Sequence, residues 1–400
     1  MILREFFATR EEWARVKYYP YEGYDLLLGR DGYLYFLEAN AVPAGIYVVS
    51  VIARIQGRFL PPYEKNLVKD VAKLVDRFVE MCLLHYYYER NEWPRTAMVT
   101  VPPHRESFLN PERIAISYAL KRRGIKSWIV GKSKILARNS YAGFIDPETG
   151  NEVYPDLIIR RSFDFPKGLK QVVVNPSEVG YITGSKIRTY NVVTKLLNSN
   201  QELVKYLRIP LTWYSRSGNK ILRYVEELLE MGKKAIIKPA SGSGGKGIIV
   251  INSREELEAK KGEIEKEIQN GKYLLVQELV PIMPVLLSNN LHYAFDIRVY
   301  GFMGRLVSVH LRRAPAPINN GCLRYENVVS NVSAGGSPIL ALIDPTSKES
   351  IRVVKSRGGV LRIADKTFQL DDHVVVIGGS LLKKLEVIVL ELSKAISEAV

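Results

Sequence analysis

The sequence predicts a mixed α/β and α+β protein built from more than one domain. Three observations support this fold class. A strand–helix–strand alternation runs between residues 96 and 159, a mostly β stretch with one charged helix runs from residue 234 to about 313, and the chain has 400 residues. This length exceeds one ordinary domain, and 46% hydrophobic with 25% charged residues is typical of globular proteins.

The first 60 residues are strand-like and rich in tyrosine, and a helix is expected after them. Over residues 66–86 apolar side chains recur at helical spacing, namely at Leu67, Val71, Leu74, Phe78 and Cys82. Such a stripe is typical of a helix that packs against a core. Residues 66–86 are therefore predicted to form one amphipathic helix.

A small α/β unit is expected next. Residues 96–101 are predicted to form a buried strand, and residues 111–123 a helix that Gly124 ends as a C-cap glycine. Two more strands are expected at residues 127–130 and 156–159. Strand, helix and strand in this order predict a small α/β unit.

Four further helices complete the expected elements. Two lie at residues 189–197 and 219–231, a charged one lies at residues 253–270 inside the β-rich stretch, and the last runs from residue 381 to about 399.

The charge balance restricts the partners of the protein. The formal net charge is +15, and residues 95–195 contain 17 Lys and Arg against 8 Asp and Glu. A basic surface attracts nucleic acid, acidic proteins or anionic metabolites through its field. No aromatic ladder interleaves with the basic residues, so we do not expect nucleic acid. An acidic substrate, such as a glutamate-rich peptide, or an acidic carrier protein fits this charge.

Cysteine usage and hydropathy predict a cytoplasmic protein without a membrane segment. Cys82 and Cys322 form neither a disulfide framework nor a metal-ligand spacing. No apolar run approaches the roughly 20 residues that span a bilayer. The first residues carry early acidic groups and do not resemble a secretory leader.

A hairpin near the start of the chain brings two carboxylates together. Asp31-Gly32 lies between two apolar runs, which is a strong signal for a two-residue turn. With that turn, Asp25 lies directly opposite Glu38, and Asn40 lies on the same face. Two carboxylates and an amide oxygen are suited to one or two Mg²⁺ ions bound together with phosphates. A solvated edge hairpin whose acids face water is the alternative.

A glycine-rich loop between two predicted strands is the second candidate site. The loop follows Lys238 and contains Ser241, Gly242, Ser243, Gly244, Gly245 and Lys246. Glycines let backbone N–H groups approach phosphate oxygens closely. A strand follows this loop instead of a helix, so it is neither a P-loop nor a dinucleotide fingerprint. A mobile surface turn is the alternative.

Downstream residues add candidates for binding a nucleotide and for charge stabilisation. A predicted strand stops at a proline directly after Gln277, Glu278, Leu279 and Val280. Backbone groups at this end could bind an adenine edge. Two strands around residues 301–304 are predicted to form a hairpin that carries Arg298 and Arg313. Both arginines are candidates for holding a transferring phosphoryl group. Salt bridging at the rim of the sheet is the alternative for either arginine.

Together, residues 234–336 resemble the nucleotide-binding part of the ATP-grasp superfamily. The shared order is Lys-Pro before a glycine loop, a Gln-Glu-Leu-Val hinge, Asp-Ile-Arg, a paired Arg, and Asn-Val-Ser-Ala-Gly-Gly. The likeness is greatest to the glutathione synthetase and ribosomal-protein glutamate ligase branch. That branch ends in an Asp followed by Glu-x-Asn and Pro-Gly, whereas here this element stands at Asp25, Glu38, Asn40 and residues 42–45. The resemblance therefore implies a circularly permuted ATP-grasp fold, preceded by a small α/β pre-ATP-grasp domain.

The resemblance also implies residue roles and domains. Lys186 and Lys238 would be the phosphate-binding lysines, residues 241–247 the lid and residues 277–280 the adenine hinge. Substrate would lie near Arg105, Arg160, Arg161 and Asn331. The domains would be a metal-binding hairpin at 1–50, a helix with the substrate domain at 51–180, the lid subdomain at 181–280 and the catalytic subdomain at 281–400.

The chemistry that this resemblance implies is ATP-dependent ligation of a carboxylate, from a small molecule or a peptide, to an amine. The reaction would pass through an acyl-phosphate, with Mg²⁺ bound. A small-molecule kinase that phosphorylates a hydroxyl is the first alternative. A basic binding protein without catalysis, including a degenerate ATP-grasp regulator, is the second.

Overall fold

The computed structural model describes residues 8–101, 111–162, 165–242, 245–269, 271, 273–287, 291–318, 323–330, 335–363 and 366–400. None of the helices in these ranges combines the length and the apolar character that crossing a membrane requires.

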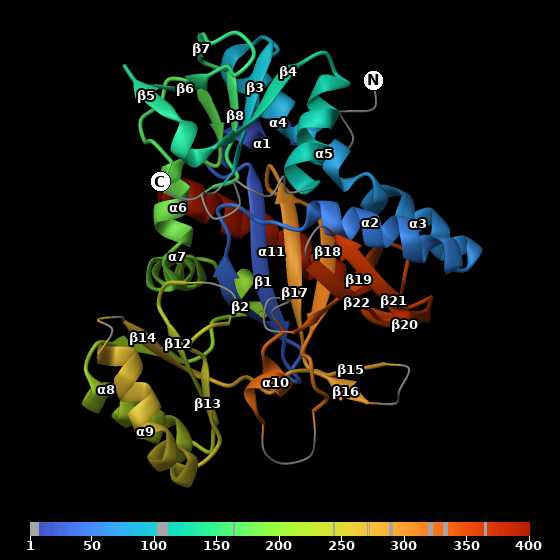
Figure 1. The fold of residues 1–400 in the computed structure, drawn as a ribbon. Coiled ribbons are helices and arrows are strands. Elements are labelled where there is room, and N and C mark those ends of the chain that lie inside the picture. The colour runs from blue at the N-terminus through green and yellow to red at the C-terminus, as the bar shows by residue number, and fades with distance from the viewer. Residues whose placement is uncertain are drawn as a thin grey trace.

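An eight-stranded mixed sheet forms the centre of the molecule (Figure 1). Its order is β10–β2–β1–β17–β18–β19–β23–β20. The strands are β10 (Leu207–Arg208), β2 (Leu34–Ala39), β1 (Tyr21–Leu28), β17 (Phe295–Phe302), β18 (Arg305–Arg313), β19 (Ser337–Asp344), β23 (His373–Gly378) and β20 (Ile351–Lys355). The hairpin β1–β2, called the front hairpin below, thus lies inside a sheet that is otherwise built mainly from the second half of the chain.

The two faces of the central sheet carry different cores. Helix α11 (Gly379–Glu398) packs on one face, where Leu385 and Leu392 are fully buried with apolar side chains of β1 and β17. Helices α2 (Ile46–Gln56) and α4 (Leu74–Arg90) cover one end of the other face, around Phe78. The uncovered part of that second face borders the cavity described below.

The paired carboxylates of the front hairpin are opposed as predicted, but by a different route. Asp25 pairs with Glu38 in the register. Gly32 donates to the Gly29 carbonyl (3.0 Å) and has φ +80°, so the turn is a three-residue loop, 30–32, instead of a two-residue one. That loop alone would place Leu37 opposite Asp25. A β-bulge at Leu37 adds one residue and restores the pairing.

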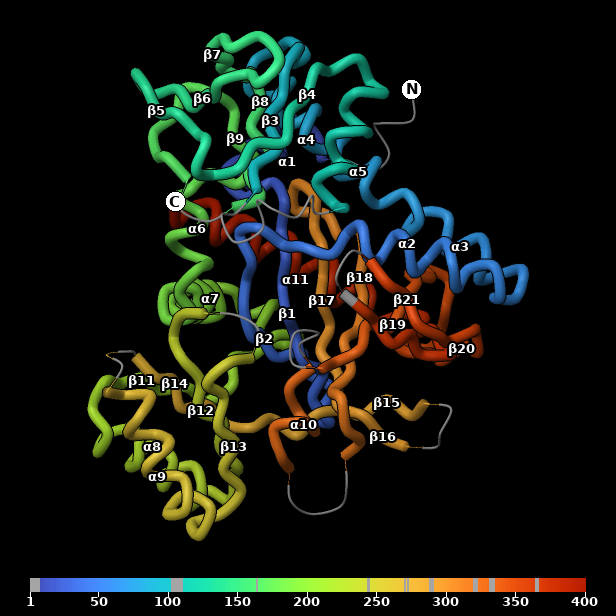
Figure 2. Tube along the Cα trace, viewed as in Figure 1, coloured from blue at the N-terminus to red at the C-terminus, as the bar shows by residue number. Residues whose placement is uncertain are grey.

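A second, smaller sheet, called the lid sheet below, forms a separate layer beside the centre (Figures 1 and 2). Its order is β11–β14–β12–β13, with helices α8 and α9 packed on it. The elements are β11 (Thr212–Ser215), α8 (Gly218–Glu230), β12 (Ala235–Pro239), β13 (Ile249–Ile251), α9 (Arg254–Gln269) and β14 (Leu274–Glu278). The antiparallel pair β12–β13 carries the glycine-rich loop at its tip, as the sequence predicts.

A parallel four-stranded sheet, ordered β4–β3–β8–β9, forms the predicted small α/β unit. It consists of β3 (Thr96–Val101), α5 (Pro111–Lys121), β4 (Lys126–Gly131), β8 (Leu157–Ile159) and β9 (Val172–Val174), and a small sheet of β5 (Leu136–Arg138), β6 (Tyr141–Ile145) and β7 (Glu152–Val153) lies beside it. Gly124 follows α5 at φ +79°, in agreement with the predicted C-cap. After β9, the Asn175 amide donates to the carbonyls of Tyr21 and Ala41, which joins this unit to the central sheet.

The helix predicted over residues 66–86 consists of two helices, α3 (Pro62–Ala72) and α4. The chain leaves helical geometry at Lys73, where φ is −103° and ψ is 12°. Side chains of α2 bind the end of α3: Ser50 donates to the Val71 carbonyl (3.3 Å) and Arg54 to the Ala72 carbonyl (3.0 Å). These contacts satisfy carbonyls that a helix end exposes, so tertiary packing favours a break that the apolar pattern does not show.

The other predicted helices are present with shifted ends. The remaining elements are α1 (Arg10–Ala14), α6 (Ser177–Thr183), α7 (Lys186–Ser199), α10 (Tyr325–Val328), β15 (Val285–Leu286), β16 (His292–Tyr293), β21 (Gly359–Ile363), β22 (Lys366–Leu370) and the 3₁₀ turns Gly57–Phe59, Lys132–Lys134 and Leu203–Lys205. The domain limits predicted at residues 50 and 180 fall inside α2 and α6.

The segment before β1 lies beside the end of the last helix. The Tyr18 N–H donates to Ser397 Oγ (3.2 Å), and the Tyr24 and Ser393 hydroxyls bond each other (2.8 Å). A circular permutation requires such proximity of the two ends of the fold. The permutation itself stays a prediction.

Candidate functional site

One cavity brings the front hairpin and the glycine loop together. Its empty volume is about 970 Å³, part of it open to solvent. The lining residues that the sequence predicted are Asp25, Glu38, Lys186, Lys238, Ser241, Gly242, Gly245, Lys246, Gln277, Glu278, Leu279 and Val280. Acids of the hairpin therefore face lysines of the lid across one space, although more than 200 residues separate Asp25 from Lys238 in the chain.

Four predicted site residues lie outside the described residues. They are Arg105, Ser243, Gly244 and Asn331.

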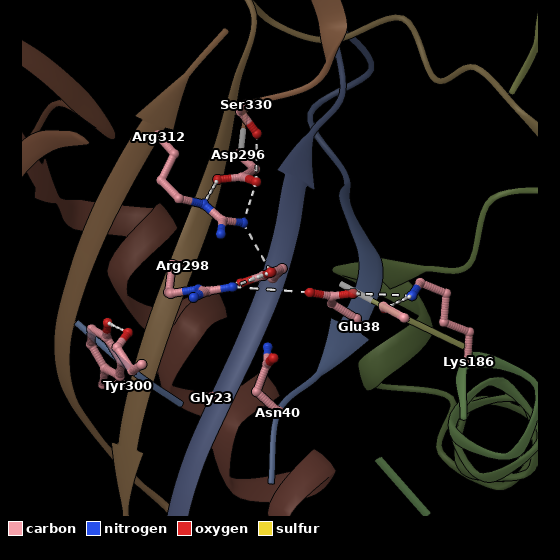
Figure 3. A network of polar contacts seen from close by, with 12 residues as sticks. Gly23, Glu38, Asn40, Lys186, Asp296, Arg298, Tyr300, Arg312 and Ser330 are labelled. Carbon is pink, nitrogen blue, oxygen red and sulfur yellow. Dashed lines mark hydrogen bonds and ion pairs between the residues drawn. The ribbon is translucent and has the colours of Figure 1, made fainter. Parts of the chain in front are cut away.

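Asp25 is held by the guanidinium groups of Arg298 and Arg312, which are labelled in Figure 3. Arg298 donates through Nε and Nη2 to the two Asp25 oxygens, each at 2.6 Å, and Arg312 Nη2 donates at 2.9 Å. Burial alone would raise the pKa of the Asp25 carboxyl, but the two guanidinium groups together hold it well below its usual range. Asp25 is therefore ionised throughout the physiological range.

Glu38, the opposed carboxylate, has weaker partners. Its oxygens lie 3.5 Å from Lys186 Nζ and 4.0 Å from an Arg298 nitrogen. Burial and the neighbouring Asp25 carboxylate raise the pKa of Glu38. Glu38 is thus the acid of this pair that would gain most from an added cation.

Asn40 completes the predicted ligand group on the same side of the hairpin (Figure 3). Its side-chain Nδ2 is buried and has no hydrogen-bond partner. The oxygen and the nitrogen of a side-chain amide are assigned from their hydrogen bonds. The Asn40 amide could therefore turn its oxygen toward a cation bound between the two carboxylates, which would explain the unsatisfied group.

Arg312, and not its predicted neighbour Arg313, faces the cavity. Arg312 lies opposite Asp296 in the register of β17 and β18 and donates to it through Nε at 2.8 Å. Ser330 Oγ donates to the same carboxylate at 2.6 Å. Side chains alternate along a strand, so Arg313 lies on the other face, where its Nε is 3.3 Å from an Asp371 oxygen. The lining of the cavity therefore includes Arg312 and not the predicted Arg313, and the predicted Arg298 adjoins it through its bonds to Asp25.

Lys238 is buried between the lid and the central sheet. Its Nζ donates to Gln277 Oε1 at 2.6 Å and to the Tyr190 hydroxyl at 3.2 Å. Burial lowers the pKa of Lys238 to about 8. An uncompensated buried ammonium of this kind is suited to receive an anionic ligand.

Lys186, the other predicted phosphate-binding lysine, lies at the first turn of α7. Its Nζ donates to the carbonyl of Gly242 in the glycine loop at 3.2 Å. Gly242 has φ +110° and Gly245 has φ +75°, which are backbone conformations that favour glycine. Tyr325 of α10 donates to the Gly245 carbonyl at 3.0 Å. The loop is thus anchored on both sides of its tip.

The predicted hinge runs along the cavity at the end of β14. The Leu279 N–H donates to the Lys234 carbonyl at 2.8 Å, and the Glu278 carboxylate accepts from Leu211 N–H at 3.1 Å and from Lys233. These contacts fix residues 277–280 against the lid sheet. The backbone conformation of the hinge is therefore set before any ligand binds.

The predicted substrate arginines Arg160 and Arg161 do not line this cavity. Arg161 is fully buried, pairs with Glu112, and its guanidinium lies 5.4 Å from the centre of the Tyr21 ring. Arg160 donates to the carbonyls of Asn175 and Ser162, and burial lowers its pKa to about 10. Arg161 thus contacts β1 of the central sheet, whereas the hydrogen bonds of Arg160 hold the ends of β8 and β9 together.

Besides Arg312, the sequence reasoning missed three side chains of the site. Asp296 and Ser330 both line the cavity, and the Ser330 hydroxyl donates to the Asp296 carboxylate. The third is Tyr190, whose hydroxyl accepts from Lys238. Asp296 stands in the Asp-Ile-Arg motif that was singled out, and strand alternation places it on the Arg298 face. Tyr190 carries no local signal, because it lies on a helix and its partners are distant in sequence.

An acidic group away from the cavity could also offer metal ligands. Asp371, Asp372 and His373 place one ligand atom each within 4.8 Å of one another. Arg313 already pairs with Asp371, as Arg298 and Arg312 pair with Asp25. The difference is that Asp25 and Glu38 line the cavity, whereas these three residues do not.

Two comparisons match parts of the chain to known proteins. Residues 170–309 match the family model of the tubulin-tyrosine ligase family, which spans the lid sheet and the hinge as well as the β17–β18 hairpin. Over 74 residues the chain is 32% identical to a phosphoribosylamine–glycine ligase of Methanococcus maripaludis (strain C7 / ATCC BAA-1331). That match covers 17% of this chain and 17% of the relative.

Solved structures extend the likeness to the whole chain. A putative gamma-glutamylcysteine synthetase from Methylobacillus flagellatus KT is similar over 98% of this chain and 92% of its own, with a TM-score of 0.60 and 12% identity. A RimK domain ATP-grasp protein from Sphaerobacter thermophilus DSM 20745 covers 76% of this chain and 99% of its own, with a TM-score of 0.38 and 13% identity. The likeness to the first of these structures shows the fold alone, and the predicted ATP-grasp fold is confirmed at that level.

Proposed function

We propose that the protein is an ATP-dependent carboxylate–amine ligase that works through an acyl-phosphate. The observation that carries this proposal is the single cavity in which Lys186 and Lys238 face the carboxylates of Asp25 and Glu38. Cations on one wall suit the phosphates of ATP, and acids on the other suit the metal that accompanies them.

The nucleotide would bind between the lid and the central sheet. Residues 277–280 would contact the adenine, and the backbone of residues 241–246 would lie over the phosphates. Lys186 and Lys238 would bind phosphate oxygens as point charges. Because Lys238 is already buried, it would gain an anionic partner without further loss of solvent.

The residues near the hairpin fit one or two Mg²⁺ ions. Glu38 and Asn40 would be ligands, because one has a raised pKa and the other an unsatisfied amide. Asp25 would be a ligand only through an oxygen that it shares with a guanidinium. When bound, Mg²⁺ supplies charge neutralisation to the phosphates.

The reaction would proceed in two displacements. A substrate carboxylate oxygen attacks the γ-phosphorus, the bond from that phosphorus to the β-phosphate oxygen breaks, and ADP leaves. The amine nitrogen then attacks the acyl carbon, the bond from that carbon to the phosphate oxygen breaks, and the amine proton passes to the departing phosphate or to water. Arg298 and Arg312 would stabilise the charge on the transferred phosphoryl group.

The composition of the cavity agrees with a mechanism that needs no protein nucleophile. The described lining residues include neither a cysteine nor a histidine. Catalysis would therefore depend on positioning and electrostatic stabilisation.

The test is release of ADP and phosphate with Mg²⁺ across a panel of amino acids, polyamines and small peptides. We expect both products together with a new amide. Glu38→Gln should lower the rate by at least about 100-fold, because a metal ligand is lost. Asp31→Asn, in the turn of the same hairpin and outside the cavity, is the matched control and should retain the rate.

The products separate the ligase from its alternatives. ADP with a phosphate ester and no free phosphate would show a kinase. Salt-sensitive binding of a polyanion without ADP release by the wild-type protein would show a binding protein and would contradict the proposal.

A further inference from the structure

Tyr190 connects the two walls of the cavity through one hydroxyl group. The side chain is buried on α7, and its ring lies edge-on to Phe36 of β2 with ring centres 6.0 Å apart. The hydroxyl donates to the Leu37 carbonyl at 2.8 Å and accepts from Lys238 Nζ at 3.2 Å. It also accepts from Gln277 Nε2 at 3.1 Å. One atom thus touches the front hairpin, the lid lysine and the hinge strand.

These three contacts use the full hydrogen-bonding capacity of a phenol. A tyrosine hydroxyl has one donor and two acceptor positions. Burial raises the pKa of Tyr190 to about 12, so the hydroxyl keeps its proton and remains a donor. The proton points to Leu37 because the two other partners are themselves donors. The orientation of the hydroxyl is therefore fixed by its surroundings.

The acceptor of that proton is the bulge residue of β2. An extra residue in a β-bulge is left out of the regular ladder, so its backbone groups need other partners. The hydroxyl of Tyr190 supplies one to Leu37. Because the bulge restores the pairing of Asp25 with Glu38, a bond to the Leu37 carbonyl acts directly on the position of Glu38.

We propose that Tyr190 is a positioning residue that couples the lid lysine Lys238 to the carboxylate hairpin through the Leu37 bulge. This inference rests on the proposed function, in which Lys238 binds phosphate and Glu38 binds Mg²⁺. Tyr190 contacts neither nucleotide nor metal in this account. It fixes the distance between the two groups that do.

The variant Tyr190→Phe removes the hydroxyl and keeps the ring on Phe36. Lys238 would keep its bond to Gln277 Oε1, and Gln277 Nε2 would keep its bond to Thr212 Oγ1 (2.7 Å). The Leu37 carbonyl would lose the partner described here. The larger effect should therefore fall on the hairpin and its metal ligand.

Binding of a non-hydrolysable ATP analogue, measured by calorimetry with Mg²⁺ and again with EDTA, separates these effects. The ratio of the two dissociation constants is the Mg²⁺ enhancement. A weakened Lys238 contact lowers affinity in both conditions and cancels from the ratio, whereas a displaced Glu38 lowers the ratio. We expect Tyr190→Phe to lower the Mg²⁺ enhancement about tenfold, in line with the loss of one buried hydrogen bond.

Tyr24→Phe is the matched control, because it removes another buried tyrosine hydroxyl, on β1, whose partner is Ser393 of α11. Thermal melts establish that both variants fold. The control should leave the Mg²⁺ enhancement unchanged even if its melting temperature falls.

Three results decide the inference. A lower enhancement in Tyr190→Phe alone supports it. An unchanged enhancement in a folded Tyr190→Phe, with a wild-type protein that binds the analogue, overturns the inference and leaves the proposed function intact. No binding by the wild-type protein in either condition overturns both.

Discussion

Two pairs of largely buried arginines occupy different regions of this molecule and differ in what surrounds them. Arg312 lines the cavity and Arg298 adjoins it through its bonds to Asp25, whereas Arg160 and Arg161 lie at the junction between the small parallel sheet and the central sheet. At the cavity, Asp25 is shared by both guanidinium groups, and Asp296 binds Arg312. At the junction, Arg161 binds Glu112 beside aromatic rings.

The difference between the pairs lies in access and in partner sharing. The side chain of Arg298 is 14% exposed, whereas that of Arg161 is 0% exposed. A guanidinium that shares its carboxylate at the wall of a cavity can exchange partners with an incoming phosphate. A guanidinium sealed between rings and a buried carboxylate cannot. Arginine in a buried ion pair therefore indicates a binding role only when a cavity adjoins it.

The largest expected effect comes from Arg312→Met. Removing this group takes away a charge that would stabilise the transferred phosphoryl group, so turnover should fall by about 100- to 1,000-fold. Asp25 keeps its two bonds to Arg298 and Asp296 keeps its bond from Ser330, but Asp296 loses its cation, so the melting temperature should fall and turnover is compared per folded molecule. Steady-state ADP release and a thermal melt measure the two quantities. The neighbouring variant Arg313→Met, on the other face of β18, should lose far less turnover.

Arg161→Met should show the reverse pattern. It takes Arg161, the closest cation, from the buried Glu112 carboxylate, which costs up to about 3–5 kcal/mol of unfolding free energy. Turnover per folded molecule should change by less than about threefold, since Arg161 does not line the cavity. Urea unfolding and ADP release decide this. A folded Arg161→Met with turnover as low as that of Arg312→Met would restore the sequence-based assignment of Arg161 to the substrate.

A smaller effect concerns pH and separates Lys238 from the arginines. Burial lowers the pKa of Lys238 to about 8, and a bound phosphate would favour its ammonium form. ATP affinity should therefore be constant below pH 8 and fall by up to about tenfold per unit as pH rises above 8. Calorimetric titrations from pH 6.5 to 9.5 measure this. Lys238→Met should bind weakly at every pH, without the decline, and a decline that persists in this variant would assign it to another group.

The hairpin shows how a correct prediction can rest on an incomplete pattern. Asp31-Gly32 indicated a two-residue turn, and the opposition of Asp25 to Glu38 followed from it. The structure has a three-residue loop and a bulge at Leu37, and the two changes cancel in the register. The bulge residue Leu37 accepts a hydrogen bond from the distant Tyr190 hydroxyl, a contact that no local signal in the hairpin contains.

Adjacent arginines show a second limit of sequence reasoning. Alternation predicts that Arg312 and Arg313 point to opposite faces but does not say which face holds the site. The register of β17 with β18 decides it, because Arg312 lies opposite Asp296. Strand register is a long-range property and was not available from the motif alone.

Local charge counts have the same weakness. The basic stretch from residue 95 to 195 includes Arg122 and Arg123, which pair with Asp76 and Glu80 of α4. The buried Arg161 likewise has an acid partner, within the stretch itself. Part of the local positive charge is thus neutralised by the fold. Most of the other expected elements depend on local patterns and are present. The expectation that the first 60 residues are strand-like was wrong in part, because α1 and α2 lie among them.

The central claim is that the front hairpin and the lid bind one nucleotide from opposite sides. A crystal structure with a non-hydrolysable ATP analogue and Mn²⁺ in place of Mg²⁺ tests it most directly, because Mn²⁺ is located by its anomalous signal. We predict a Mn²⁺ peak bonded to a Glu38 oxygen and to a phosphate oxygen of the analogue, with Lys238 on the same phosphates. A nucleotide bound at Lys238 whose metal does not touch Glu38, or a nucleotide bound elsewhere, would contradict the claim.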